Sequence, residues 1–176
     1  MKDFLLIAIT SPTPLPQEGD VINSLLRNGE VDFVHIRKPD YSEEETEKLL
    51  NDIEERFHPL LKLHDHFSLT AKYNLGGIHL NKRNPKAYPG TKSLSCSIHS
   101  LYEIDKADGM DYFFISPVYD SISKEGYKGA FDLYDLSDRI KGKRAVALGG
   151  VTPEKFDELK SFGFYGAAML GHFWGK

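Results

Sequence analysis

The stretch AVALGGVTPE, residues 145–154, contains a complete junction between a strand and a helix. Its first four residues are apolar and have the length of a short buried strand. Gly149-Gly150 then permits a tight turn of the backbone. Thr152-Pro153 is typical of a helix start, because a Thr side chain can accept from the free N–H groups and Pro lacks an N–H where none is needed. The stretch therefore predicts a strand that leads directly into a helix.

Apolar runs of the same length recur along the chain, and most are separated by polar, amphipathic stretches typical of helices. The clearest helix is expected to begin after Ser42, which precedes three Glu residues, and to continue to about Phe57. The helix after Thr152 is expected to end at Gly163. Shorter helices are expected over residues 68–73 and 99–107. Eight runs are expected to form strands: residues 5–9, 31–36, 60–63, 77–80, 93–97, 112–115, 145–148 and 166–170.

Eight strands that alternate with helices predict parallel β-α units, arranged as a closed barrel or as an open doubly wound sheet. The first turn, residues 10–14, has no glycine fingerprint, although such a turn is usual in open nucleotide-binding sheets. We therefore expect a small (β/α)8 TIM barrel formed by residues 1–176 as a single domain. The chain stops soon after the eighth run, so the last helix of the fold is expected to be missing.

The composition excludes several classes of protein. With 176 residues, 40% of them hydrophobic and a net charge of −4, the chain is expected to form a soluble globular protein that binds neither nucleic acid nor membrane. The lone cysteine, Cys96, excludes an intramolecular disulfide and is expected to be a small buried residue. The first apolar run is too short for a signal peptide, so we expect a cytoplasmic protein.

In a barrel of this kind the site lies at the carboxyl ends of the strands. Five cations follow predicted strands, which favours an anionic ligand such as a phosphate or diphosphate: Arg37, Lys38, Lys82, Arg83 and Lys124. Arg37 would pair either with that ligand or with a carboxylate of the chain. Gly149 and Gly150 would let the backbone approach a phosphate, or would serve only as a tight turn.

His64-Asp65-His66 follows the third predicted strand and suggests two interpretations. Asp65 could bind Mg²⁺ through its carboxylate oxygens. A transition-metal site would need further ligands from other strands. His79 and His99 are available, but the spacing is not that of a zinc site. We therefore expect His66 to belong to the following helix and His64 to pack against a loop.

Several short motifs, taken in order, resemble those of the thiamine phosphate synthase and TenI superfamily of small barrels. The resemblance extends from about Phe4 to Leu170, nearly the whole chain. The matching stretches are Val34-His35-Ile36-Arg37, Leu63-His64-Asp65, Gly76-Gly77-Ile78-His79-Leu80, Ser97-Ile98-His99-Ser100 with Glu103, Asp111-Tyr112, Ser116-Pro117-Val118-Tyr119 through Lys124, and Ala147-Leu148-Gly149-Gly150-Val151.

The resemblance implies a transferase that joins hydroxymethylpyrimidine diphosphate to thiazole phosphate, releasing diphosphate and forming thiamine phosphate. It implies Mg²⁺ as the cofactor, with Asp65 as a ligand. It further implies diphosphate contacts for Arg37, Lys124 and Ser97. By the same match, the substrate-binding residues would be His35, Lys38, His64, Ser121, Ser123, Gly149 and Gly150.

The chain departs from the family pattern at several of these positions. His35 stands where synthases usually have Gln, Lys38 is displaced by one position, and His64 replaces the usual Asn. Asn84 stands where a second metal-binding Asp is usual, which should weaken Mg²⁺ binding. We hypothesise that Lys82 and Arg83 partly replace the charge of the metal.

Three other functions stay open at this point. A TenI-like thiazole phosphate tautomerase would need neither diphosphate nor metal, although Pro117 stands where the tautomerase has a His. A non-catalytic relative would keep only the thiazole phosphate pocket. A metal-dependent hydrolase, suggested by His64 and His66, is the third. A homodimer is a further expectation, since a short barrel would leave its last strand uncovered.

Overall fold

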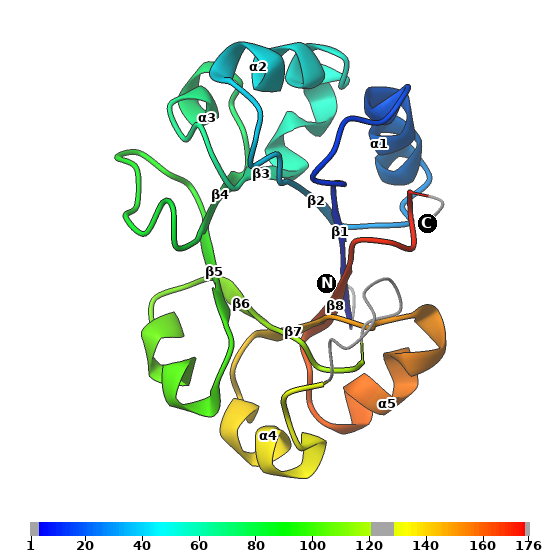
Figure 1. The fold of residues 1–176 in the computed structure, drawn as a ribbon, viewed down its shortest axis with the longest axis vertical. Helices are drawn as coiled ribbons and strands as arrows, with labels where there is room; N and C mark the ends of the chain where they lie inside the picture. Colours follow the sequence, from blue (N-terminus) through cyan, green and yellow to red (C-terminus); the bar gives the residue numbers. More distant parts are fainter. Residues whose placement is uncertain (1–3, 121–128, 175–176) are drawn as a thin grey trace. The chain divides into compact units, whose positions relative to one another are not determined.

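The computed structural model describes residues 4–120 and 129–174, in which eight parallel strands alternate with helical segments (Figure 1). The strands are joined in chain order into a closed barrel, which confirms the predicted (β/α)8 architecture. The strands are β1 (Leu5–Ile9), β2 (Phe33–Ile36), β3 (Leu61–Leu63), β4 (Gly77–Leu80), β5 (Leu94–Ile98), β6 (Tyr112–Ile115), β7 (Ala145–Leu148) and β8 (Gly166–Met169).

All eight predicted strands are present, and β1, β4, β6 and β7 have the predicted bounds. The bounds of the other four differ by one or two residues at an end. The agreement has a simple cause: strands covered on both faces read as continuous apolar runs. The β7 run, for example, is buried along its first three residues.

The helical segments are α1 (Glu18–Arg27), α2 (Glu43–Asn51), η1 (Glu55–Leu60), α3 (Leu69–Lys72), η2 (Leu101–Ala107), α4 (Leu133–Ile140), η3 (Pro153–Lys155) and α5 (Phe156–Ser161), where η marks a 3₁₀ helix. Ser42 caps α2 as predicted, since its hydroxyl accepts from the Glu45 N–H and the Glu45 carboxylate accepts from the Ser42 N–H. No helix occupies residues 81–93, between β4 and β5.

The predicted end of the helix after Ser42 is wrong. The α2 helix ends at Asn51 rather than near Phe57, and η1 follows it. The cause lies in α1, where the buried side chain of Asn23 donates to the Asp52 carbonyl (3.0 Å) and accepts from the Glu54 N–H (2.8 Å). Those bonds hold the backbone out of the helix, and the sequence of α2 alone does not reveal them.

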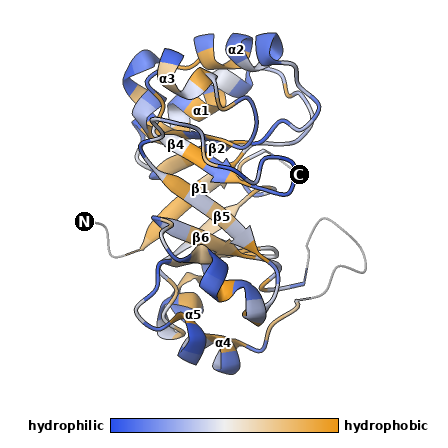
Figure 2. Cartoon of the chain, turned by 90° about the vertical axis from the view of Figure 1, so that its left-hand side faces the viewer, coloured by the Kyte–Doolittle hydropathy of each residue, from blue (hydrophilic) through white to orange (hydrophobic). Residues whose placement is uncertain are grey.

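Contacts divide the chain into two compact units, residues 1–7 with 95–176 (unit 1) and residues 8–94 (unit 2). The core of unit 1 includes Phe113, Ile115, Leu136 and Leu159. In Figure 2 the strand β1 carries mostly hydrophobic colours, whereas α2 shows hydrophilic residues beside hydrophobic ones, as expected for a helix with one buried face. Among the described residues, no helix has the length and apolar character needed to cross a membrane.

Candidate active site

Arg37 follows β2 at the carboxyl end of the strand, in unit 2. Its backbone is held by Thr10, whose hydroxyl accepts from the Arg37 N–H (2.8 Å) and lies 3.3 Å from the Arg37 carbonyl. The side chain is partly buried, and its guanidinium forms no hydrogen bond or ion pair with any residue in the described parts of the chain. Arg37 was expected to pair with an anionic ligand or with a carboxylate of the chain. No carboxylate in the described parts of the chain pairs with it. The arrangement leaves the guanidinium available to an anionic ligand.

Asp65, just after β3, is held by two residues of the loop after β4. Arg83 grips the carboxylate with two hydrogen bonds, Nε to Oδ1 (3.1 Å) and Nη2 to Oδ2 (2.9 Å). The side-chain amide of Asn84 donates to Oδ1 as well (2.8 Å). Such a fork-to-carboxylate pair is among the stronger ion pairs, and the Asp65 side chain is only 14% exposed.

The residues present do not fit a Mg²⁺ ion at Asp65. Mg²⁺ needs several oxygen ligands in a nearly octahedral arrangement. Asn84, at the position of the second expected carboxylate, presents its NH₂ group to Asp65 instead of an oxygen. The guanidinium of Arg83 already lies against the carboxylate and balances its charge. Asp65 therefore already has a positively charged partner in this structure.

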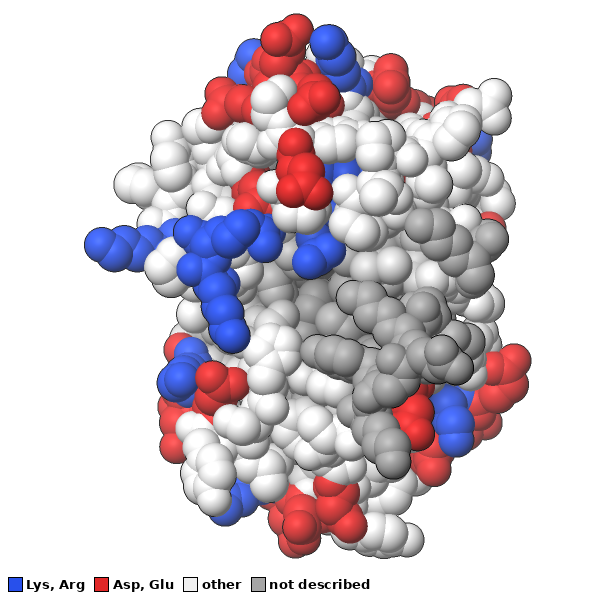
Figure 3. Space-filling view, in the orientation of Figure 1, with Lys and Arg blue, Asp and Glu red and all other residues white. Residues whose placement is uncertain are grey.

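The loop after β4 is cationic along its length. Residues 80–92 contain no Asp or Glu, and in Figure 3 Lys and Arg side chains gather over this loop. Asn81 anchors the loop, since its amide donates to the His64 carbonyl (2.6 Å) and its oxygen accepts from the Arg83 N–H (2.9 Å). The loop thus gives unit 2 an anion-attracting edge beside Asp65. Its cations are Lys82, Arg83, Lys86 and Lys92.

Lys38 has its charge balanced inside the chain. Its ammonium forms a buried ion pair with Glu18 of α1 and donates to the Thr13 carbonyl (3.0 Å). Burial lowers the pKa of Lys38 and raises the pKa of Glu18. The sequence did not identify Glu18 as a partner, because nothing in its local pattern marks it as buried. This geometry gives Lys38 the role of joining α1 to the end of β2.

His35 and His64 lie together in the interior of unit 2. His35 Nδ1 is 2.9 Å from His64 Nε2, and the rings of His64 and His79 stack with centroids 4.2 Å apart. Burial is the main cause that lowers the pKa of His35 and of His64 far below the usual value. His64 does meet a loop, since its carbonyl accepts from Asn81 and Asn84 after β4, but its ring contacts a buried histidine of β2 and another of β4. His66 precedes α3 rather than belonging to it, and its Nε2 lies 2.7 Å from the Tyr41 carbonyl oxygen.

Gly149 and Gly150 follow β7 in unit 1, and both have positive φ, +93° and +65°. A Cβ at Gly149 would lie 2.8 Å from Pro117 Cα, and one at Gly150 would lie 2.2 Å from the Asp120 carbonyl oxygen. The close approach of residues 117–120 therefore requires both glycines. This packing explains why glycine occupies both positions. It also leaves backbone without a side chain at Gly150, which lines a hollow.

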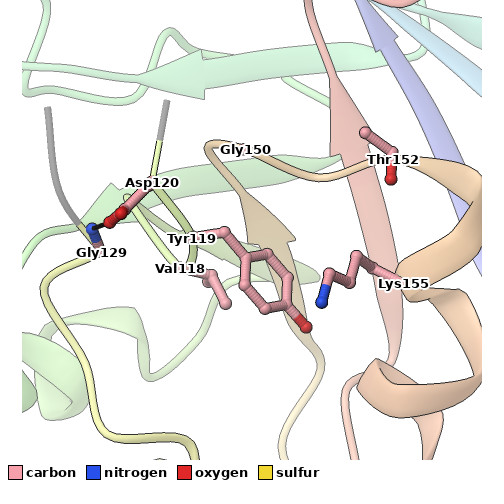
Figure 4. A pocket seen from close by; sticks show the side chains of 7 residues that line it. All are labelled: Val118, Tyr119, Asp120, Gly129, Gly150, Thr152 and Lys155. Atoms are coloured by element: carbon pink, nitrogen blue, oxygen red, sulfur yellow. Dashed lines mark hydrogen bonds between the residues drawn. The ribbon is translucent and has the colours of Figure 1, made fainter. Parts of the chain in front are cut away.

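A hollow of about 500 Å³ lies beside Gly150 in unit 1 (Figure 4). In Figure 4 the Tyr119 ring and the Lys155 ammonium point toward each other, and the ammonium lies 5.0 Å from the ring centroid. The Tyr119 hydroxyl donates to Glu158 (2.7 Å), which also pairs with Lys155 (3.4 Å). The sequence analysis missed Lys155, although its place in the first turn after Gly149-Gly150 could have identified it. The lining residues are Val118, Tyr119, Asp120, Gly129, Gly150, Thr152 and Lys155.

Of the remaining predicted residues, the structure describes Ser97, in unit 1. Ser97 is the second-last residue of β5 and is partly buried. Cys96 precedes it and is half-buried rather than fully buried; burial raises the pKa of its thiol to about 11. Ser121, Ser123 and Lys124 lie outside the described residues.

Comparison with known proteins gives a consistent result. The family model described as thiamine monophosphate synthase matches residues 6–173. A thiamine phosphate pyrophosphorylase from Bacteroides thetaiotaomicron has a similar structure, with a TM-score of 0.85 and 36% identity, over 98% of this chain and 86% of that one. A second pyrophosphorylase, from Pyrococcus furiosus, shares the fold at a TM-score of 0.77 and 18% identity, over 99% of this chain and 89% of that one.

Curated relatives agree in kind. A thiamine-phosphate synthase from Synechococcus sp. is 26% identical over 183 residues, and a putative thiamine-phosphate synthase 2 from Aquifex aeolicus is 25% identical over 166 residues. The Aquifex match covers 88% of each chain, whereas the Synechococcus match covers 97% of this chain and only 51% of the relative. The chain thus spans about half the length of the Synechococcus protein. Because the family model matches nearly the whole chain, the chain belongs to the thiamine monophosphate synthase family.

Proposed function

We propose that this chain is a thiamine-phosphate synthase, which couples hydroxymethylpyrimidine diphosphate to thiazole phosphate and releases diphosphate. The observation that carries the proposal is the family match over residues 6–173, together with 36% identity to a solved pyrophosphorylase along 98% of the chain. The Arg37 guanidinium at the end of β2 has no partner among the described residues and supports the proposal, because the reaction needs a cation at the diphosphate.

The reaction depends mainly on electrostatic stabilisation of the leaving group. The bond between the pyrimidine methylene carbon and the diphosphate oxygen breaks, and its electron pair leaves with the diphosphate. The lone pair of the thiazole nitrogen then forms the new C–N bond to the cation left behind. Negative charge therefore grows on the leaving group, and fixed positive groups beside it lower the barrier.

In this proposal Arg37 and Arg83 hold the diphosphate. No residue in the described parts of the chain occupies a donor of the Arg37 guanidinium, and Thr10 fixes the backbone that carries it. Arg83 is 46% exposed and keeps donors beyond those that Asp65 occupies. We propose that Arg83 supplies the charge that the family resemblance assigns to Mg²⁺, so that Asp65 positions Arg83 instead of a metal.

The thiazole phosphate would bind in unit 1, on the N–H groups of Gly149 and Gly150 and on Lys155. Support comes from the hollow beside Gly150 and from the position of Lys155 in the first turn after it. Ser97, Ser121, Ser123 and Lys124 keep the roles that the family resemblance implies, as contacts of the diphosphate and of the thiazole phosphate.

The proposal also includes the cellular location and the oligomeric state of the protein. We propose that the protein works in the cytoplasm, where the lone cysteine stays reduced. We also propose that it forms a homodimer. Size-exclusion chromatography with light scattering tests the second statement, and a monomeric mass at micromolar concentration would contradict it.

Product analysis separates the synthase from its alternatives. The full chain is incubated with both substrates, and separately with a tautomer of the thiazole phosphate alone. Thiamine phosphate from the pair of substrates supports the proposal. Tautomer conversion without coupling would favour the TenI-like enzyme. Thiazole phosphate binding without any turnover would favour the non-catalytic relative, and either of these two results overturns the proposal.

A further inference from the structure

Three histidines from neighbouring strands meet in the interior of unit 2. His35 lies on β2, His64 directly follows β3, and His79 lies on β4. One ring nitrogen of each lies within 4.8 Å of one from each of the others. The residues are 0%, 5% and 1% exposed. The strands bring them together, since β3 pairs in parallel with β2 and with β4.

The distances suit a single small metal ion. Zn²⁺ binds imidazole nitrogens at about 2.0–2.1 Å, which in a tetrahedral site places two such nitrogens about 3.4 Å apart. His35 Nδ1 and His64 Nε2, at 2.9 Å, would separate by a few tenths of an ångström to accept an ion. The wider pairs are separated by up to 4.8 Å. The rings of His64 and His79 stack at an interplanar angle of 17°, so at least one of them must turn out of the stack before both nitrogens can point at one ion.

The chemistry of the cluster selects the kind of ion. The cluster offers imidazole nitrogens and no carboxylate, a set that suits transition metals such as Zn²⁺, Cu²⁺ or Ni²⁺ rather than Mg²⁺ or Ca²⁺. Imidazole binds such ions in its neutral form. Asp65 lies outside this set, because Arg83 and Asn84 hold its carboxylate.

We propose that His35, His64 and His79 bind one transition-metal ion of the zinc class, with a solvent molecule in the fourth position. The ion would cross-link β2, β3 and β4 in the barrel interior. The ligands of this ion are different residues from the anion-binding Arg37 and Arg83. The metal proposal does not depend on the proposed synthase activity. Positive charge nearby, on Lys62, Arg37 and Arg83, opposes the ion, so K62M should tighten binding.

Metal titration of the full, tag-free chain tests the proposal. The protein is stripped with EDTA, dialysed, and titrated with Zn²⁺ in competition with a chelating dye. We expect one equivalent to bind, and H64Q and H79Q each to weaken binding by at least about 100-fold, more than the loss typical of residues around a metal's ligands. H172Q is the matched control, since His172 is exposed and outside the cluster, and it should bind as the wild type does.

A measurement on the unmodified protein covers the case in which the buried variants fail to fold. In ¹⁵N-histidine NMR spectra, one equivalent of Zn²⁺ should shift the ring nitrogens of three of the seven histidines. These signals should belong to His35, His64 and His79, assigned in the unmodified protein by through-bond correlation of each ring to its backbone amide. Absence of stoichiometric binding, or shifts confined to other histidines such as His172, would overturn the proposal.

Discussion

At the scale of single residues, Arg37 is the side chain on which the proposed chemistry depends most. Its guanidinium has no partner in the described parts of the chain, so removing it disturbs no ion pair there. A hydrogen bond to a charged group contributes about 1.5–3 kcal/mol, and R37Q should therefore lower kcat/KM about 10- to 100-fold. Steady-state kinetics of thiamine phosphate formation measures the change.

The control for this variant is R139Q, on the exposed face of α4. It removes one positive charge from the surface in unit 1 and should leave kcat/KM unchanged. Equal losses in the two variants would mean that net charge, and not the place of Arg37, governs the rate.

Lys38 and Glu18 form a buried pair whose stability depends on both partners. K38M would leave the Glu18 carboxylate buried without its cation, and breaking such a pair costs about 3–5 kcal/mol of the free energy of unfolding. The double variant E18L/K38M removes both charges and should recover most of that loss. Urea denaturation followed by circular dichroism measures both, and a single variant as stable as the wild type would contradict the buried pairing.

Cys96 gives the clearest pH dependence. With the pKa of its thiol raised to about 11, chiefly by burial and then by Glu103, only about one thiol in a thousand is ionised at pH 8. Alkylation by iodoacetamide should therefore be at least about 100-fold slower than for free cysteine, and should accelerate about tenfold per pH unit from pH 8 to pH 10. Because the chain has a single cysteine, mass spectrometry reads the rate directly. A plateau near pH 9 would refute the raised pKa.

At the scale of elements, Asn23 links α1 to the end of α2. N23A would leave the Asp52 carbonyl and the Glu54 N–H without this partner, at a cost of about 1–3 kcal/mol in the free energy of unfolding. S24A, on the exposed side of the same helix, is the control and should change stability by less than about 0.5 kcal/mol. Urea denaturation of the two variants provides the comparison, and equal stabilities would show that these bonds do not set the helix end.

The elements also show what a sequence can reveal. The β7 strand and the Ser42 cap could be predicted because their causes are local: a continuous apolar run, and a Ser three residues before a Glu. The end of α2 could not, because it depends on Asn23, which is about 30 residues away in the chain. The candidate site shows the same difference between local patterns and contacts that are distant in the chain. Arg37 was recognisable at its strand end, whereas the Asp65–Arg83 and Lys38–Glu18 pairs join residues 18 to 20 positions apart.

At the scale of the whole molecule, the barrel, the family and the cationic strand ends lead to one functional account. The fold and the family match were both predictable, because eight apolar runs and the order of short motifs extend over nearly the entire chain. Of the departures from the family pattern, the replacement of a carboxylate by Asn84 bears most directly on the metal, because Asn84 and Arg83 both hold the Asp65 carboxylate.

The most direct measurement is the rate of thiamine phosphate formation by the full chain with both substrates, in the presence of EDTA and again with millimolar Mg²⁺. Because Arg83 carries the charge that a metal would bring, the account predicts product in EDTA, at a rate within about tenfold of the rate with Mg²⁺. A reaction that proceeds only with Mg²⁺ would contradict the role given to Arg83. No product under either condition would contradict the synthase itself.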